Sequence, residues 1–204
     1  LEPILQYVCQ KKSHWYNKYQ VQISIDTRNA ATLEKAIKLG GIDILNDVSG
    51  LQNKNLQNIV KDNALPAIFM HSLTVPANKK IILPLNRDPT QYLYQWAERK
   101  IQKLNSLGIK SNNLIFDPGI GFGKNSIQNL QLITNFSNFK KLGIKLLLGH
   151  SRKSWLNQFL DNNLDNNLYR DELTSIASTL CQAADILRVH NIDQHYQKLK
   201  VRWD

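Results

Sequence analysis

The sequence predicts an α/β fold in which strands and helices alternate around a parallel sheet. Six short apolar runs are spaced along the chain, amphipathic segments separate them, and polar motifs follow most of the runs. Runs that are apolar on both faces are typical of parallel strands buried between helices. Repeated βα units of this kind imply right-handed crossovers between neighbouring strands.

Each apolar run is short enough for a single strand. The six runs are VQISI at 21–25, GIDIL at 41–45, PAIFM at 66–70, NLIF at 113–116, KLLLG at 145–149 and DILRV at 185–189. Before the first run, Leu1, Ile4, Leu5 and Val8 have the spacing of a helix. The sequence therefore predicts an opening helix followed by six strands.

Two of the intervening helices have recognisable ends. The first has apolar positions at Leu33 and Ala36 and stops at the glycine pair 40–41, as expected of a helix C-terminus. The second begins at Asp88 with Pro89 behind it, a capping residue followed by proline at the first helical position.

A third helix is predicted from about Asp171 to Ala184. Its inward face is expected to carry apolar residues at helical spacing, namely Leu173, Ile176, Ala177 and Leu180. Such a face would pack on the sheet beside the last strand.

The number of strands and the chain length together point to one architecture. A (β/α)₈ barrel typically has roughly 250 residues, whereas this chain has 204. We therefore predict a (β/α)₈ TIM barrel with about six of its eight βα units present. The predicted organisation is a single domain over residues 1–204 that is incomplete at its N-terminal end.

Composition excludes several function classes. The net charge is +10, but the cations are spread over helix faces, as at Lys35 and Lys38, so we predict a solvated surface and no nucleic-acid partner. We find no run of membrane-spanning length and no signal-peptide pattern, so no membrane partner is expected. Cys9 and Cys181 have no metal-ligand spacing and are predicted to be buried free thiols in a cytoplasmic protein.

Five polar motifs close or follow the apolar runs: SIDT at 24–27, NDVSG at 46–50, DPGIGF at 117–122, GHSRKS at 149–154 and RVH at 188–190. In α/β barrels and open parallel sheets, catalytic groups lie on the loops after the strands. The repeated placement predicts one shared site. GIGFGKNS does not fit a P-loop, because position 118 is proline and position 125 is asparagine.

Several motif residues have a specific chemistry and a structural alternative. Asp117 follows a fully apolar strand, so its buried carboxylate needs donors; alternatively it is a cap or turn former. Asn46 can both donate and accept, or can form a turn. Asp26 can stabilise developing positive charge or cap a helix. Asp47 is expected to hold the local backbone.

The last two motifs suit anions. The segment after KLLLG is expected to open a helix with exposed N–H groups, and Lys153 within it is a candidate ligand-binding cation. Arg152 fits a surface salt bridge as well as a site role. Arg188 and His190 alternate along the end of the last strand and should share a face, a pairing that suits phosphate oxygens.

In order and wording, these motifs together with Met70-His71 resemble dihydropteroate synthase, a pterin-binding enzyme family, over essentially all 204 residues. The resemblance implies a transferase of folate biosynthesis, and a sulfonamide target. Its substrates would be 6-hydroxymethyl-7,8-dihydropterin diphosphate and p-aminobenzoate, and its products 7,8-dihydropteroate and pyrophosphate, with Mg²⁺ as cofactor. A homodimer is also implied.

The resemblance also implies residue roles. The implied catalytic residues are Asp26 and Lys153, and the implied pterin-binding residues are Asp26, Asn46, Met70, Asp117 and Lys153. Those for p-aminobenzoate are Phe122, Lys153 and Ser154, and those for the diphosphate are Arg188 and His190. Met70 and Phe122 have core packing as their alternative. Asn191 departs from the aspartate usual in the family.

The family's asparagine ligand for magnesium lies on a strand before the first residue of this chain, so no metal ligand is expected here. Loops of the first two units also help to enclose p-aminobenzoate, and we therefore expect this chain alone to be inactive. A non-catalytic pterin-binding remnant or partner subunit is the alternative. A pterin-dependent methyltransferase domain is a further alternative, against which SRKS and RVH argue.

Overall fold

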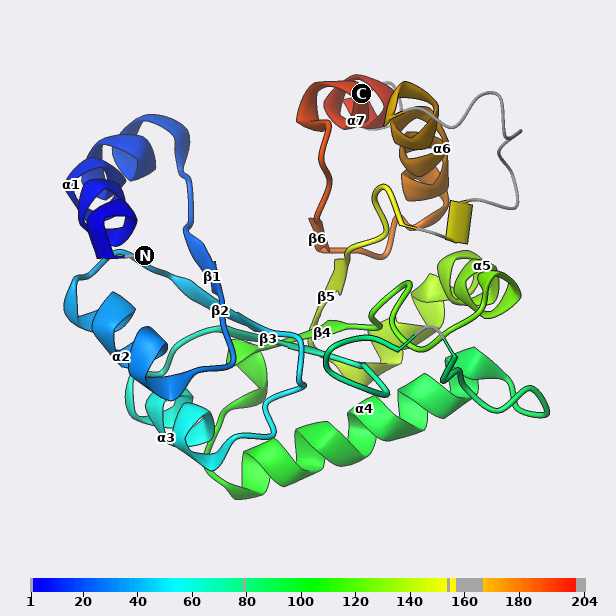
Figure 1. Ribbon diagram of the computed structural model, residues 1–204, viewed down its shortest axis with the longest axis horizontal. Helices are drawn as coiled ribbons and strands as arrows, with labels where there is room; N and C mark the ends of the chain where they lie inside the picture. The colour runs from blue at the N-terminus through cyan, green and yellow to red at the C-terminus, as the bar shows by residue number, and fades with distance from the viewer. Residues whose placement is uncertain (1, 79, 154, 157–166, 201–204) are drawn as a thin grey trace. The chain divides into compact units, whose positions relative to one another are not determined.

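The computed structural model describes residues 2–78, 80–153, 155–156 and 167–200. Helices and strands alternate along most of the chain (Figure 1). The helices are α1 (Glu2–Tyr19), α2 (Ala30–Lys38), α3 (Lys54–Asp62), α4 (Pro89–Ser106), α5 (Ser126–Thr134), α6 (Asn167–Leu180) and α7 (Ile192–Lys200). The 3₁₀ segments in the described part of the chain include η1 (Ser111–Asn113) and η2 (Phe136–Leu142).

The six predicted strands are confirmed. They are β1 (Ser24–Asp26), β2 (Ile44–Asp47), β3 (Ala67–Met70), β4 (Leu114–Asp117), β5 (Lys145–Leu148) and β6 (Ile186–Leu187), and their order in the sheet is the order of the chain. Several strands end one or two residues later than the apolar runs, because the first polar residue of the motif still pairs in the sheet. Strand β6 is shorter than predicted, so Arg188 and His190 lie after it.

The chain divides into two compact units. The first unit contains residues 1–70 and 100–115, and the second contains residues 71–99 and 116–204. Strand β4 begins in the first unit and ends in the second, so Asp117 at its end belongs to the second unit.

In the first unit, β1, β2 and β3 pair in parallel, with Asp26 opposite Asn46 and Asn46 opposite Ile68. This register places the two polar residues at the same end of neighbouring strands. Helices α2 and α3 lie side by side (Figure 1), and each begins at an asparagine cap, Asn29 and Asn53, whose side chain accepts backbone N–H groups of the first turn. Leu33 of α2 and Leu56 of α3 are fully buried.

In the second unit, an aromatic cluster fills the core. The rings of Phe116 and Phe139 lie 5.3 Å apart, and those of Phe136 and Phe139 lie 5.9 Å apart, both in edge contacts. Trp96 contacts Phe116 at 6.2 Å and His71 at 4.8 Å. Strand β5 pairs in parallel with β6 through Leu148 and Leu187. This core supports the loops that follow β4 and β5.

Helix α6 differs from its prediction. It begins four residues earlier than expected and ends at Leu180. Ala177 is buried, but Ile176 and Leu180 are exposed and Leu173 is half-buried, so the predicted apolar inward face is wrong. The buried face is mainly polar and consists of Asp171, Thr174, Ser175 and Ser178 with Ala177. This polar face of α6 forms hydrogen bonds with residues of the loop after β5.

Both cysteines are free, as predicted, but only Cys181 is buried, and Cys9 is half-buried. Burial raises the pKa of the Cys181 thiol to about 12. None of the helices in the described part of the chain combines the length and the apolar character that crossing a bilayer would require.

Candidate functional site

Asp26 and Asn46 are brought together in the first unit. Asp26 ends β1 and is exposed, whereas Asn46 in β2 is buried. Asn46 Nδ2 donates to Asp26 Oδ2 at 2.9 Å, which orients the amide and turns its oxygen away from the aspartate. Among the described residues, this buried Asn46 Oδ1 has no hydrogen-bond partner. An unpaired buried acceptor is costly, so this atom is a candidate for a ligand N–H group.

Asp47 holds the local backbone, as predicted. Its Oδ1 accepts from the backbone N–H and the hydroxyl of Ser49 at 2.8 and 2.6 Å, and its Oδ2 accepts from Leu51 N at 3.0 Å. These bonds fix the loop that follows Asn46. Met70 ends β3 and is buried in the core, so a role as a wall of the pterin pocket stays a prediction.

Asp117 is the most buried charged group of the second unit's site, with no exposed surface. Its Oδ1 accepts from Gly119 N at 2.8 Å, and its Oδ2 accepts from Arg188 Nη2 at 2.8 Å. Burial raises the pKa of this carboxyl, whereas the charges of Arg188 and Lys153 and the bond from Gly119 oppose the rise. Asp117 therefore needs donors, as the sequence predicted, and here Arg188 is one of them.

A glycine makes this ion pair possible. A Cβ placed on Gly149, just after β5, would lie 2.5 Å from Arg188 Nη2. Any larger residue would occupy the path of the guanidinium toward Asp117. The glycine of the GHSRKS motif therefore allows Arg188 to pass close over the backbone.

Lys153 and Phe122, both predicted to contact p-aminobenzoate, lie together in the second unit. Lys153 Nζ lies 4.2 Å from the centre of the Phe122 ring, within cation–π range. Lys153 also acts on the carboxyl of Asp117 through its charge. Ser154, the other residue predicted to bind p-aminobenzoate, lies outside the described residues.

Lys124 is a functional candidate that sequence reasoning missed. Its buried Nζ donates to the carbonyls of Gly119 at 2.9 Å and Phe122 at 2.8 Å and lies 3.1 Å from His71 Nδ1. Burial lowers its pKa to about 7 and that of His71 to about 3. The lysine gathers the loop that carries Asp117 and Phe122. Its place directly after GIGFG was a usable signal, because a lysine inside an otherwise apolar loop needs partners.

The loops after β5 and β6 are joined by a serine and a histidine. Ser151 Oγ lies 2.8 Å from His190 Nδ1 and accepts from His190 N at 3.2 Å. His190 is exposed, as is much of the Arg188 side chain, so both can reach an anion. Residues 151 and 152 form a turn, and the next described residues after Lys153, 155 and 156, have a 3₁₀ conformation. Residues 157–166 lie outside the described part of the chain.

Arg152 forms the salt bridge that was one of its two interpretations. Its Nε and Nη2 donate to the two carboxylate oxygens of Asp171 at 2.8 and 2.7 Å, a bidentate pair. Hydrogen bonds from Arg152 and Asn191 lower the pKa of Asp171 against the effect of burial. Asp171 was not predicted as a site residue, because it was assigned only to the start of α6.

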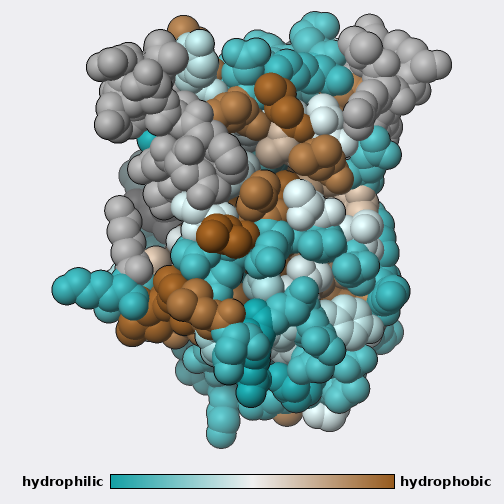
Figure 2. Space-filling view, turned by 90° about the vertical axis from the view of Figure 1, so that its right-hand side faces the viewer, coloured by the Kyte–Doolittle hydropathy of each residue, from teal (hydrophilic) through white to brown (hydrophobic). Residues whose placement is uncertain are grey.

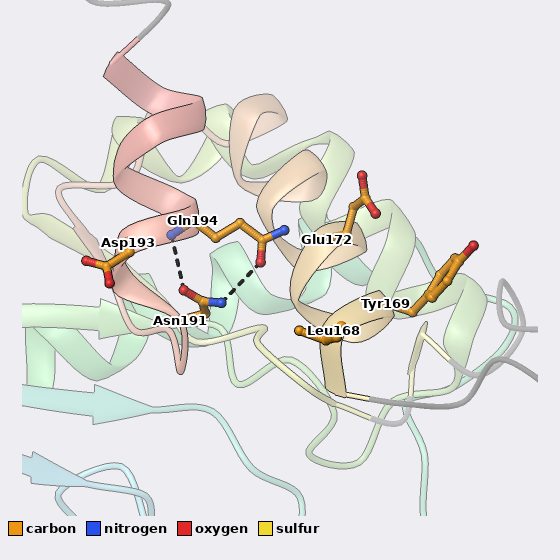
Figure 3. A pocket seen from close by; sticks show the side chains of 6 residues that line it. All are labelled: Leu168, Tyr169, Glu172, Asn191, Asp193 and Gln194. Atoms are coloured by element: carbon orange, nitrogen blue, oxygen red, sulfur yellow. Dashed lines mark hydrogen bonds between the residues drawn. The ribbon is translucent and has the colours of Figure 1, made fainter.

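A surface pocket lies between α6 and α7 (Figure 3). Its lining residues are Leu168, Tyr169, Glu172, Asn191, Asp193 and Gln194. The residues predicted to bind substrates are not among them. Figure 3 shows two hydrogen bonds between Asn191 and Gln194 at the start of α7: Asn191 Oδ1 accepts from the backbone N of Gln194 at 3.1 Å, and Asn191 Nδ2 donates to Gln194 Oε1 at 3.3 Å. Asn191 is thus a helix cap beside the predicted site.

Comparison with known proteins gives consistent results. The family described as "Pterin binding enzyme" matches residues 5–190. The "Folate synthesis bifunctional protein" of Chlamydia caviae is 33% identical over 98% of this chain and 44% of its own length. The "Dihydropteroate synthase" of Haemophilus influenzae is 31% identical over 91% of this chain and 66% of its own length.

Solved structures agree in fold. Dihydropteroate synthase from Thermus thermophilus, in complexes with 6HMPPP and with 4-aminobenzoate, has a TM-score of 0.81 and 26% identity. Each match covers 98% of this chain and 74% of the other chain. This likeness confirms the predicted (β/α)₈ class, with about six of the eight βα units present in this chain.

The chain spans less than half of the first of these relatives and just under two thirds of the second. The family match nevertheless extends over most of the chain and includes all five polar motifs. The chain belongs to the pterin binding enzyme family.

Proposed function

We propose that this chain is the greater part of a dihydropteroate synthase, a cytoplasmic transferase of folate biosynthesis. Its substrates are 6-hydroxymethyl-7,8-dihydropterin diphosphate and p-aminobenzoate. The observation that carries the proposal is the fully buried carboxylate of Asp117 with Arg188 and Lys153 acting on it. A carboxylate so placed can accept N–H groups of a pterin ring, while the guanidinium of Arg188 can bind the diphosphate.

Each predicted site residue has its own role in binding or catalysis. Asp117 binds the ring edge, and the unpaired acceptor of Asn46 takes a ring N–H. Lys153 binds the ring carbonyl, and Phe122 and Ser154 contact p-aminobenzoate. Met70 forms a wall of the pterin pocket, and Asp26 stabilises positive charge as it develops on the pterin. Arg188 and His190 hold the diphosphate.

The chemistry is a displacement at the pterin methylene carbon. The C–O bond to the diphosphate breaks and its electron pair leaves with pyrophosphate. The amine nitrogen of p-aminobenzoate forms the new C–N bond and loses one proton. Positioning and electrostatic stabilisation supply the catalysis, and no covalent enzyme intermediate is needed.

Magnesium belongs to the proposal as a companion of the diphosphate. Arg188 and His190, which are proposed to hold the diphosphate, offer nitrogen groups that can bond an anion, whereas Mg²⁺ prefers oxygen ligands. Within the described part of the chain, no three His, Cys, Asp or Glu residues are grouped as a metal would require.

A homodimer and sulfonamide sensitivity are also proposed. Support for self-association is the exposed apolar surface of α6 and α7, which includes Ile176, Leu180, Ile192 and Tyr196. On the face drawn in Figure 2, brown apolar residues lie among teal hydrophilic ones. Sedimentation over a range of concentrations tests the dimer.

Calorimetry with the dihydropterin diphosphate, followed by p-aminobenzoate, tests the function. Asp117→Asn keeps the shape of the side chain but should weaken pterin binding about 100-fold, since charged hydrogen bonds contribute about 1.5–3 kcal/mol each. Asp185→Asn is the matched control, because Asp185 lies before β6 and pairs with Lys140 on the surface. No pterin binding by the folded wild-type chain would refute the assignment.

A further inference from the structure

The segments that carry the predicted diphosphate ligands share one buried carboxylate in α6. Asp171 has almost no exposed surface and accepts both bonds of the Arg152 fork. Its Oδ2 also accepts from Asn191 Nδ2 at 3.4 Å. Arg152 belongs to the loop after β5, and Asn191 belongs to the loop after β6. One side chain of α6 therefore binds both loops.

The two loops that Asp171 binds both lead to His190. Asn191 is its direct neighbour in the chain. Arg152 follows Ser151, whose hydroxyl lies 2.8 Å from His190 Nδ1 and accepts from His190 N. Asp171 thus binds the residue that follows each partner of the Ser151–His190 contact, namely Arg152 after Ser151 and Asn191 after His190. Asp171 is therefore linked to His190 through both loops.

The backbone at Arg152 supports this interpretation. Arg152 has a φ of +53°, in the left-handed region that residues other than glycine rarely adopt. Such a conformation persists only where the surroundings hold it, and it is concentrated at functional sites. Here the bidentate bond to Asp171 holds the side chain, while Thr174 Oγ1 lies 3.5 Å from Arg152 N.

The amide at position 191 matches this arrangement. Asn191 Nδ2 donates toward Asp171, while Asn191 Oδ1 caps α7 by accepting from Gln194 N, as Figure 3 shows. An aspartate at this position would keep the cap but place a second carboxylate against Asp171. Only a residue that donates on one side and accepts on the other serves both partners, and asparagine does so without adding charge.

We infer that Asp171 is a positioning residue that fixes His190 for the diphosphate of the substrate, acting through Arg152 with Ser151 and through Asn191. The inference rests on the proposed function, since it concerns the same anion site. It assigns no contact between Asp171 and the substrate. Removing the carboxylate should therefore weaken recognition of the diphosphate and leave recognition of the pterin ring unchanged.

Calorimetry on Asp171→Asn tests this with two probes, the dihydropterin diphosphate and 6-hydroxymethyl-7,8-dihydropterin, which has the ring without the diphosphate. We expect about a tenfold weaker affinity for the diphosphate, the scale at which outer partners act on a site, and less than a twofold change for the ring compound. Glu172→Gln is the matched control. It removes an acid from the adjacent, exposed position of α6, which faces Lys198.

A second variant keeps the test decisive if Asp171→Asn folds poorly. Asn191→Asp preserves the helix cap and should also weaken diphosphate binding. The double variant, Asp171→Asn with Asn191→Asp, again has one donor and one acceptor at this contact. It should therefore recover part of the lost diphosphate affinity. Equal weakening of both probes, or unchanged diphosphate affinity in all variants, would overturn the inference. Failure of the wild-type chain to bind either probe would instead refute the proposed function.

Discussion

The two units hold their candidate site residues in different ways. In the first unit, one exposed carboxylate and one buried amide share a single hydrogen bond, and the amide oxygen has no partner among the described residues. In the second unit, the buried carboxylate of Asp117 is neutralised by Arg188, and Lys124 is buried among carbonyls. The first arrangement offers an unused acceptor, whereas the second holds charges that already have partners.

This difference has an energetic meaning. A buried neutral amide that loses a hydrogen-bond partner costs less free energy than a buried charge that loses its partner. Substitutions in the second unit should therefore reduce stability and ligand binding together. In the first unit, a substitution should more easily change ligand binding without an equal change in stability. Variants in both units test this difference, and substitutions of the buried charged residues should lower stability the most.

Lys124→Met should have the largest effect on stability, about 3 kcal/mol at pH 9, because several acceptors lose their donor. The pKa of Lys124 is about 7 in the folded chain against an ordinary 10.5, so the unfolded chain binds more protons between these values. The wild type should therefore gain stability as pH rises from 7 to 10.5, and the variant should lack this gain.

Chemical denaturation of both proteins between about pH 6 and pH 10, a range that spans the two pKa values, measures this difference. Lys141→Met, a change at an exposed lysine of the same unit, is the control and should have little effect. A stability difference that does not vary with pH would contradict the buried, partly neutral lysine.

Gly149→Ala should cost about 2 kcal/mol, the usual scale of overpacking, because its Cβ would collide with Arg188. The guanidinium would then leave Asp117. In an Arg188→Ala background the same change should cost much less, and this double-mutant cycle measures the collision. Equal costs in both backgrounds would show that the glycine serves the backbone alone.

Asn46→Asp tests the first unit. The new carboxylate would face Asp26 and should destabilise the chain by about 1 kcal/mol at about pH 7, with the loss disappearing below about pH 4 as carboxyls are protonated. Exchanging both residues, Asp26→Asn with Asn46→Asp, should restore stability but not pterin affinity, since the unpaired amide acceptor is lost. Recovered pterin affinity in the exchanged protein would contradict the role given to Asn46 Oδ1.

Helix caps should give the smallest effects. Asn125 forms a reciprocal capping box with Gln128 at the start of α5, whereas Asn29 makes a single side-chain cap at the start of α2. Asn125→Ala should therefore cost about 1 kcal/mol and Asn29→Ala about half of that. Thermal unfolding of the two variants ranks them, and a larger loss for Asn29→Ala would reverse the comparison.

Strand positions could be predicted because parallel strands leave a simple signal. Apolar runs such as PAIFM and NLIF correspond to β3 and β4 almost residue for residue. The contact of Lys153 with Phe122 joins two residues that motif resemblance had assigned to the same substrate. These features depend on local sequence and on the repeated order of the βα units along the chain.

The inner face of α6 could not be predicted in the same way. Hydrophobic periodicity assumes that a helix packs against an apolar surface, but α6 packs against His150 and Arg152. Ser178 Oγ lies 3.0 Å from His150 Nε2, so polar residues are the ones that must turn inward. The ion pair of Asp117 with Arg188 was missed for a related reason. The two residues lie 71 positions apart, and sequence spacing alone cannot pair them.

If Arg188 holds the diphosphate as proposed, its bond to Asp117 would make the two ends of the ligand interdependent. An inorganic anion that draws the guanidinium away would free an oxygen of Asp117 for a heterocycle, and a heterocycle that takes over Asp117 would free the guanidinium for an anion. Thermodynamic linkage makes such assistance mutual and equal in size. A molecule that carries both groups would then bind more tightly than its separate halves suggest, and the protein would discriminate against partial mimics.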